Sequence, residues 1–229
     1  MAGSGHIVAL GGGGFSTQPG DPRLDRFIVS LARRPHPRVC FVGTASGDSD
    51  GYALRFYRAF VQLDCRPADL GLFDRTIDDL RGFVLEQDVV YVGGGNTASM
   101  LAVWRAHGLD EILREAHAAG VVLCGISAGM NCWFEASVTD SFDAATLAPL
   151  HDGLGLLPGS ACPHYDGALR RPTYRALVAQ GFPPGYAADD AVGLHFADGE
   201  LREVVSTREG ATAYRVDVDE ETALPARLL

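Results

Sequence analysis

The chain contains no lysine: all nineteen of its basic residues are arginine. This absence excludes chemistry that needs a lysine amine, such as a Schiff base, a serine–lysine dyad or a P-loop lysine. Acidic residues outnumber the arginines, and the formal net charge is −10. Because binding to nucleic acid or to an anionic membrane needs a surplus of positive charge, we expect neither partner.

Cysteine is sparse and shows no paired spacing. The five cysteines are Cys40, Cys65, Cys124, Cys132 and Cys162. An odd number without a CxxC motif argues against a disulfide framework and a zinc site, so we expect reduced thiols, no metal and no cofactor. No apolar run approaches the length of a membrane-spanning helix, and the N-terminal segment HIVAL is too short for a signal peptide. These features predict a cytoplasmic protein.

Short apolar segments that end in glycine alternate with segments of helical spacing. The predicted strands lie in residues 6–14, 38–46, 88–96 and 120–129, and the predicted helices in residues 22–34, 51–63 and 97–120. Strands that alternate with helices predict an α/β fold with a doubly wound, mostly parallel sheet flanked by helices, of flavodoxin-like type. At 229 residues the chain is expected to form a single domain spanning 1–229.

The last third of the chain has a different pattern. Residues 185–206 alternate between apolar and polar and contain the turn pair Asp198-Gly199, which predicts a hairpin. Residues 211–219 resemble a further strand. We therefore expect the parallel sheet to carry a small C-terminal antiparallel extension.

Three glycine-rich loops follow predicted strands: GGGGFS (11–16), GGGNTAS (93–99) and GISAG (125–129). In open α/β sheets, ligands bind outside the carboxyl ends of the strands. The three loops are therefore expected to lie together on one rim of the sheet, where a functional site would form.

Ser127 stands between two glycines, after the apolar run VVLC and before a helix expected to begin near Met130. This order of strand, G-x-S-x-G and helix is the context of a nucleophile elbow, whose sharp turn exposes the serine hydroxyl. The alternative is a small residue in an ordinary tight turn. The strand and helix on either side favour the nucleophile.

A serine nucleophile needs a base, and seven histidines are available. His164, in GSACPHYDG, follows a short apolar run and lies in a loop bounded by Pro163 and Gly167. That position corresponds to another strand end on the expected rim. The other six histidines fall in predicted helices, in strands or in other loops, so His164 is the favoured base.

The third member of a triad must hold the imidazole in the correct tautomer. The candidate acids are Asp140, Asp166, Asp189 and Asp190. Asp166 lies two residues after His164, a spacing also used by class I glutamine amidotransferases. The adjacent Asp189 and Asp190 point in different directions, so at most one of them would reach His164. The residue pattern alone leaves these four alternatives open.

An oxyanion hole needs backbone N–H donors aimed at the developing charge. In an elbow, the residue after the serine supplies one donor, which here is Ala128. The loop GGGNT (93–97) could supply the other. A phosphate-cradling role for that loop is less favoured, because it lacks the GxGxxG spacing and a Walker lysine.

Taken together, these motifs resemble the peptidase E family of serine peptidases, which are related to cyanophycinase and have a class I glutamine-amidotransferase-like fold. The resemblance rests on GGGNTASML (93–101), GISAGMNCW (125–133), CPHYDG (162–167) and YAADDA (186–191), in that order, and covers most of the chain. It implies hydrolysis of short peptides, most typically dipeptides that begin with aspartate.

Site roles follow from the resemblance by position. It implies Ser127 as nucleophile, His164 as general base, and Gly95 and Ala128 as oxyanion donors. The acid that it implies is Asp190, which we favour, and Asp140 matches another acidic position considered for the triad.

Substrate binding is a further implication. Recognition of an aspartyl side chain needs a cation, and Arg170 or Arg171 is where the resemblance would place it. The alternative is a solvated arginine pair at a helix start. Asn96 and Thr97 in the glycine loop are additional substrate-binding candidates, and Glu135 or Asp140 is the candidate partner for a substrate amine.

The expected partner is thus a short peptide. Two alternatives stay open: a cyanophycinase-type hydrolase or other amidase with the same triad, and an inactive module that binds a small ligand. A glutamine amidotransferase fits less well, because that class has cysteine at the elbow, whereas Cys124 lies within the preceding strand and should be buried. The oligomeric state is not decided, and a homo-oligomer is compatible with the sequence.

Overall fold

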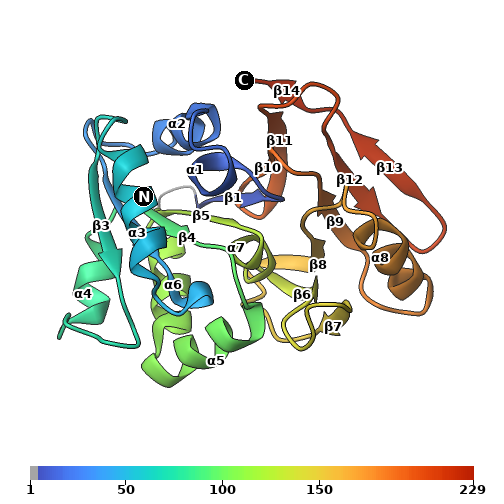
Figure 1. Ribbon diagram of the computed structural model, residues 1–229, viewed down its shortest axis with the longest axis horizontal. Helices are drawn as coiled ribbons and strands as arrows, with labels where there is room; N and C mark the ends of the chain where they lie inside the picture. Colours follow the sequence, from blue (N-terminus) through green and yellow to red (C-terminus); the bar gives the residue numbers. More distant parts are fainter. Residues whose placement is uncertain (1–4) are drawn as a thin grey trace.

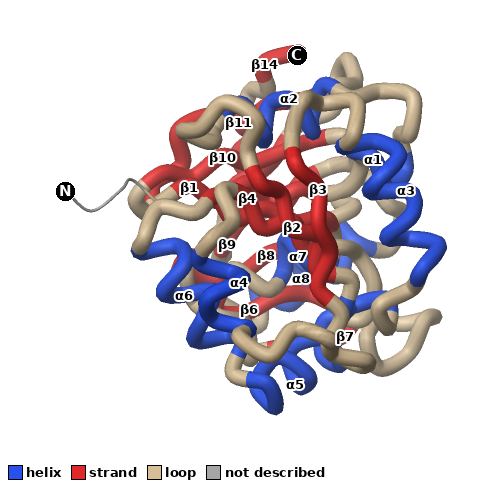
Figure 2. Tube along the Cα trace, turned by 90° about the vertical axis from the view of Figure 1, so that its left-hand side faces the viewer, coloured by secondary structure: helices blue, strands red, loops and turns tan. Residues whose placement is uncertain are grey.

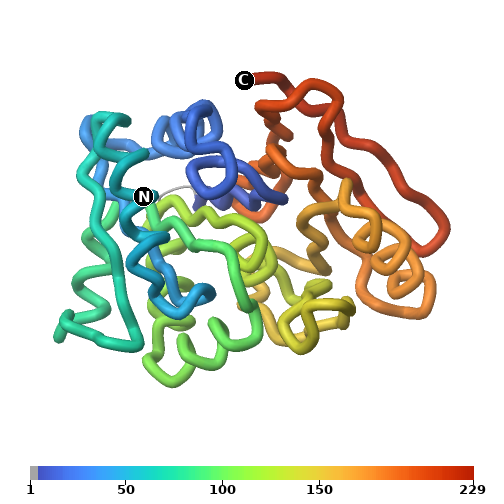
Figure 3. The backbone as a smooth tube through the Cα atoms, in the orientation of Figure 1, coloured from blue at the N-terminus to red at the C-terminus, as the bar shows by residue number. Residues whose placement is uncertain are grey.

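The computed structural model describes residues 5–229 (Figure 1). It contains a central eight-stranded sheet and a second, six-stranded sheet. Figure 3 shows that the first half of the chain builds the side with the central sheet, whereas most of the last third builds the other side. The last third also returns to the central sheet, where its strands lie beside the N-terminal strand.

The central sheet has a parallel middle. Its strands are β1 (His6–Leu10), β2 (Arg38–Val42), β3 (Arg66–Leu70), β4 (Val89–Val92), β5 (Val122–Ile126), β10 (Val192–Ala197), β11 (Glu200–Ser206) and β14 (Arg227–Leu228). They are ordered β14-β11-β10-β1-β5-β4-β2-β3. The pairs from β1 to β3 are all parallel, which confirms the predicted parallel sheet.

The predicted turn at Asp198-Gly199 joins β10 to β11, which pair antiparallel with Ala197 opposite Glu200. Both turn residues have positive φ, 54° and 80°, as a two-residue hairpin of type I′ requires. The predicted hairpin is wrong at its start, however. Residues 185–188 form a separate strand of the second sheet, because the chain changes sheets around Asp190.

Helices cover both faces of the central sheet, as Figure 2 shows. The helices of the described chain are α1 (Gly14–Thr17), α2 (Arg23–Ser30), α3 (Asp50–Phe60), α4 (Leu80–Leu85), α5 (Thr97–His107), α6 (Leu109–Ala118), α7 (Ala128–Asn131) and α8 (Arg170–Ala179), with a short 3-10 helix at Thr44–Ser46. Alternate residues of each strand enter different cores: Val8 and Leu10 pack with α1–α3, whereas Ile7 and Ala9 face the core of α4–α6.

The segment 97–120, predicted as helical throughout, is two helices. Gly108 separates α5 from α6 and has a φ of +69°. Its N–H donates to the Arg105 carbonyl, so it ends α5 as a left-handed glycine cap. No helix within residues 5–229 has both the length and the apolar character needed to cross a membrane.

The second sheet is larger than the predicted C-terminal extension. Its strands are β6 (Phe134–Thr139), β7 (Ala148–Leu150), β8 (Leu157–Cys162), β9 (Gly185–Ala188), β12 (Ala213–Val216) and β13 (Glu221–Leu224), ordered β13-β12-β9-β8-β6-β7. Strands β6, β8 and β9 run parallel, and the outer strands pair antiparallel. Tyr174 and Val178 of α8 pack on this sheet with Val138 and Cys162.

The two sheets meet where the candidate site residues lie. The N–H of His164, just after β8, donates to the carbonyl of Gly11, just after β1. The N–H of Tyr165 donates to the carbonyl of Ala188, the last residue of β9. The carboxyl ends of strands from both sheets therefore come together at one place.

Candidate active site

Ser127 occupies a sharp turn between β5 and α7, which begins at Ala128 rather than near Met130. Its backbone has φ 57° and ψ −104°, a conformation that costs a non-glycine residue about 1–3 kcal/mol. The turn is held because the Ser127 N–H donates to the Leu10 carbonyl, and its carbonyl accepts from Met130 and Asn131. The hydroxyl is thereby directed away from the sheet.

The two glycines around Ser127 are required by close packing. A Cβ on Gly125 would lie 2.5 Å from the carbonyl oxygen of Gly129, and a Cβ on Gly129 would lie 2.5 Å from that of Val92. Side chains at these positions would push the turn away from β4 and β5. The spacing G-x-S-x-G is thus a geometric requirement of this turn.

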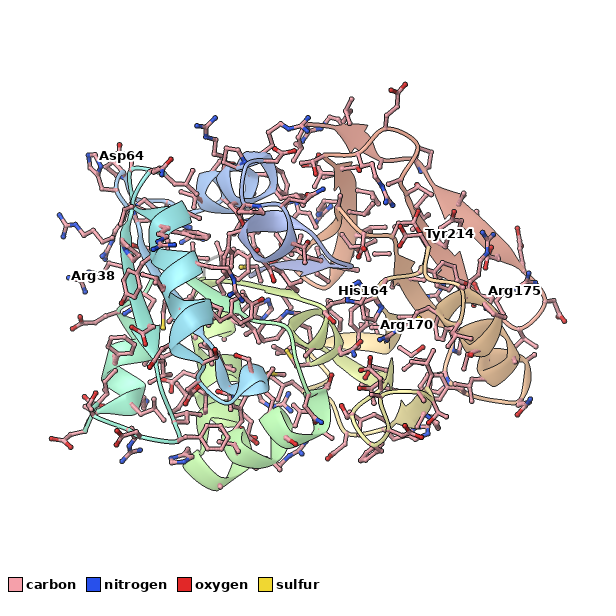
Figure 4. The ribbon with its side chains drawn as sticks, in the orientation of Figure 1. Arg38, Asp64, His164, Arg170, Arg175 and Tyr214 are labelled. Atoms are coloured by element: carbon pink, nitrogen blue, oxygen red, sulfur yellow. The ribbon has the colours of Figure 1, made fainter. Side chains whose placement is uncertain are left out.

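His164 lies against Ser127 on one side and Asp190 on the other. Its Nε2 is 2.9 Å from Ser127 Oγ, and its Nδ1 is 2.6 Å from Asp190 Oδ1. An ionised carboxylate can only accept hydrogen bonds, so Nδ1 carries the ring proton and Nε2 presents its lone pair to the serine hydroxyl. Figure 4 places His164 near the middle of the molecule, where the two sheets meet.

The loop after β1 packs directly on the histidine and the aspartate. The carbonyl of Gly11 accepts from the N–H of His164, and the carbonyl of Gly12 accepts from that of Ala191. A Cβ on Gly12 would lie 2.0 Å from Asp190 Oδ1 and 3.2 Å from the His164 ring. The sequence pattern predicts this glycine loop on the rim but assigns it no role, although the run of four glycines is a signal of close packing.

The other three candidate acids have different partners. Asp140 pairs with Arg170 at 2.8 Å, and the buried Asp189 accepts from the Thr212 N–H at 3.1 Å. Asp166 accepts from the Asp190 N–H at 3.0 Å and pairs with Arg208. Among the described residues, Asp190 is thus the one carboxylate of the four that is hydrogen-bonded to His164.

Burial raises the pKa of Asp189, because its charged form loses hydration. Burial also acts to raise the pKa of Asp166. There, however, the hydrogen bonds from Arg208 and from the Asp190 backbone prevail, and the net pKa is lower than usual. Asp166 is therefore an ionised anchor beside Asp190.

The two predicted oxyanion donors lie on loops around Ser127. Ala128 follows it directly, and the loop of Gly95 passes so close that a Cβ on Gly94 would be 3.5 Å from Ser127 Cβ. Gly95 has a φ of +142°, and a Cβ there would meet the Ala45 carbonyl oxygen at 2.1 Å. Within residues 5–229, neither the Gly95 N–H nor the Ala128 N–H has an assigned acceptor.

Asn96 and Thr97 are engaged in the structure of the loop. The Asn96 side chain caps α5 by accepting from the Ser99 N–H, and it donates to the Ser141 carbonyl. Thr97 is 1% exposed, and its hydroxyl contacts Asn131 and Thr139 inside the protein. Their polar groups therefore hold the glycine loop in place, and the buried Thr97 hydroxyl has no surface to offer a substrate.

The two candidate arginines begin α8 and point to different neighbours. Arg170 donates to Asp140 and to the Val138 carbonyl, and it lines a cavity of about 120 Å³ together with Leu147 and Leu169.

Arg171 instead pairs with Glu221 and lies over the rings of Tyr165 and Tyr214. It lines a second cavity of about 270 Å³, which also contains Asp189. Of the candidate amine partners, Glu135 accepts from the Gly159 N–H, whereas Asp140 lies beside Arg170. Cys124 is fully buried in β5, as expected.

Comparisons with known proteins agree with this architecture. The sequence profile of Peptidase family S51 matches residues 7–204. A Bacillus subtilis (strain 168) protein described as "Uncharacterized peptidase YgaJ" is 52% identical over 229 residues, covering 97% of this chain and 98% of that protein. A Streptomyces coelicolor protein named "Peptidase E" is 33% identical over 131 residues, covering 56% of this chain and 51% of its own length.

Two solved structures share the fold. A peptidase from an acI-B1 Actinobacterium has a TM-score of 0.77 at 15% identity, covering 97% of this chain and 95% of its own. A putative peptidase E protein from Listeria monocytogenes EGD-e has a TM-score of 0.65 at 19% identity, covering 90% and 99%. The fold and the family match define a peptidase, a hydrolase of peptide bonds. The chain belongs to peptidase family S51, and the resemblance to peptidase E is confirmed.

Proposed function

We propose that this peptidase is a serine-type exopeptidase that hydrolyses short peptides, preferably dipeptides that begin with aspartate. The observation that carries the proposal is the continuous hydrogen-bonded chain from Ser127 Oγ through the His164 ring to Asp190. A serine whose hydroxyl contacts a base, which is in turn oriented by a carboxylate, is the arrangement that activates serine as a nucleophile.

In this mechanism Nε2 of His164 takes the proton of Ser127 Oγ as the oxygen attacks the peptide carbonyl carbon. Asp190 keeps the Nδ1 proton in place and stabilises the imidazolium. The N–H groups of Ala128 and Gly95 hold the oxyanion. His164 then protonates the leaving amine, the C–N bond breaks and an acyl-enzyme ester stays on Ser127. Water, deprotonated by His164, hydrolyses this ester.

The aspartate preference is proposed from the pair Arg170–Asp140. An N-terminal aspartate carries a negative side chain and a positive amine close together. Arg170 offers the guanidinium for the carboxylate and Asp140 the carboxylate for the amine, and the two are already oriented toward each other. Arg171 is less suited, because its partner Glu221 is only 7% exposed, whereas Asp140 is 46% exposed and can be reached by a substrate amine.

The test is kcat/KM on matched Asp-X, Glu-X, Asn-X and Ala-X dipeptides, with Ser127→Ala as the blank. We expect a preference for Asp-X of roughly 100-fold, or about 2.7 kcal/mol. Equal rates across the set would keep the serine peptidase and reject the arginine hypothesis. Turnover of a branched Asp-Arg polymer without dipeptide turnover would point to a cyanophycinase-type hydrolase.

Labelling with a fluorophosphonate probe separates an enzyme from an inactive binding module. We expect the wild-type chain to be labelled, and labelling to disappear in Ser127→Ala. In His164→Ala, kcat should fall by roughly 10³-fold or more. Near-normal turnover of His164→Ala would show that another group is the base.

A further inference from the structure

A further cavity, of about 570 Å³, lies between the loop 18–22, α2 and α3. Its volume falls within the range of small-molecule sites, roughly 300–1,000 Å³. Its lining within the described chain includes none of the residues proposed for catalysis. The cavity therefore belongs to a different part of the molecule from the candidate active site.

The lining of this cavity combines apolar and hydrogen-bonding groups. Ala59 and Leu63 provide partly exposed apolar surface, and Gln18 and Gln62 provide amides. Asp25 is 1% exposed, and its Oδ1 accepts from the hydroxyl of Tyr91 at 3.1 Å. Burial raises the pKa of Asp25 to about 7, so at pH 7 about half of this carboxyl is protonated and its negative charge is reduced.

The unusual feature of the lining is its positive charge, which comes from arginines. Thirteen of the nineteen arginines form an ion pair with a carboxylate. Of the six that form none within residues 5–229, three line this cavity: Arg26, Arg55 and Arg58. In a chain with a net charge of −10, three unpaired guanidiniums around one hollow form a local excess of positive charge.

Two contacts show how the arginines around this cavity are held. The Arg55 guanidinium lies over the ring of Tyr52, 4.8 Å from its centroid, so its position is supported by an aromatic face. Asp21, which also lines the cavity, accepts two hydrogen bonds from the Arg23 side chain and forms no ion pair with Arg26, Arg55 or Arg58 in the described chain. The guanidiniums of Arg55 and Arg58 thus stay available to a ligand.

We propose that this cavity is a binding site for a phosphate monoester carried on an apolar body, separate from the peptidase site. A phosphate has two negative charges and three acceptor oxygens, and arginine forks pair with it bidentately. Three guanidiniums exceed what one carboxylate would use. Ala59 and Leu63 offer contact to the apolar part of the ligand. The proposal does not depend on the identity of the peptidase substrate.

The test is isothermal titration calorimetry of the full-length chain with phenyl phosphate, inorganic phosphate and benzoate at one ionic strength. We expect phenyl phosphate to bind more tightly than either of the other two, because it alone has both the dianion and the apolar ring. Binding of benzoate with equal affinity, or no saturable binding of phenyl phosphate, would overturn the proposal.

Matched variants locate the site. Arg55→Gln/Arg58→Gln should raise the Kd for phenyl phosphate about tenfold or more, equivalent to about 1.4 kcal/mol. Arg33→Gln/Arg66→Gln removes the same charge from two unpaired arginines outside the cavity and should change the Kd less than twofold. Gln62→Trp keeps every charge and should weaken binding by filling the cavity. Equal weakening in both double variants would show non-specific charge attraction and reject the site.

Discussion

Asp166 accepts a hydrogen bond from the backbone N–H of Asp190 at 3.0 Å, while its other carboxylate oxygen is held by Arg208. The residue two positions after the histidine, which the sequence offered as a triad acid, therefore holds the backbone of the aspartate that contacts His164. Asp166 thus acts through Asp190 as a positioning residue in the proposed mechanism.

The first prediction concerns this contact. Asp166→Ala removes the acceptor for the Asp190 N–H and should lower kcat by about 10- to 100-fold with little change in KM, because small misplacements of reacting groups are costly. Asp166→Asn retains an acceptor oxygen and should recover most of the rate. Steady-state kinetics on Asp-X dipeptides checks both variants. If Asp166→Asn lowered kcat as much as Asp166→Ala, the charge pair with Arg208 rather than the backbone contact would support catalysis.

The second prediction uses the glycine loop. In Gly12→Ala the new Cβ would lie 2.0 Å from Asp190 Oδ1, so the carboxylate must move away from His164. We expect kcat to fall roughly 100-fold. Gly20→Ala is the matched control, because a Cβ at Gly20 has no heavy atom within 4 Å. Equal activity of the two variants, measured together with Tm, would show that the Gly12 contact is not important for catalysis.

The third prediction separates the two arginines at the start of α8. Arg170→Met should abolish the preference for Asp-X over Ala-X, because the cation beside Asp140 is lost. Arg171→Met should keep that preference, since Arg171 contacts Glu221 and two tyrosines instead. The ratio of kcat/KM for Asp-Leu to that for Ala-Leu decides between them. The opposite pattern would transfer the specificity role to Arg171.

The fourth prediction follows from the raised pKa of Asp25. Burial lifts this pKa from 3.8 to about 7, so in the range between these values the folded protein binds a proton that the unfolded chain has released. The contribution to stability is complete below about pH 4 and is lost as pH rises through about 7. At about 1.36 kcal/mol per pKa unit, the loss is about 4 kcal/mol at most.

Asp25→Asn is the control for this effect, because an amide does not titrate and can still accept from Tyr91. Urea unfolding near pH 5 and near pH 8 should show a larger fall in the free energy of unfolding for the wild type than for Asp25→Asn. Parallel behaviour of the two proteins would mean that Asp25 ionises normally in the folded state.

Local patterns of the sequence predicted much of the fold. Buried parallel strands are apolar on both faces, so β1, β2, β4 and β5 could be recognised without knowledge of their neighbours. The turn at Asp198-Gly199 was recognisable for another local reason, because these residue types tolerate the positive φ angles that a two-residue hairpin turn needs. The break at Gly108 was missed because a glycine near the middle of a helical pattern is often tolerated.

The second sheet could not be predicted in the same way. β8 and β9 are short and separated by α8, and their pairing depends on contacts distant in sequence. The roles of Asn96 and Thr97 were also missed, because their partners at Ser141, Asn131 and Thr139 come from other elements.

Local sequence was enough to place Ser127 in a tight turn between Gly125 and Gly129, and to place His164 at a strand end. The reason is that backbone geometry at a tight turn depends on adjacent residues. Which of the four aspartates meets His164 depends on the tertiary structure, because Asp190 follows β9 and lies 26 positions after His164 in the sequence. Tertiary structure also gathered Arg26, Arg55 and Arg58 around one cavity, since that arrangement depends on how α2 packs beside α3.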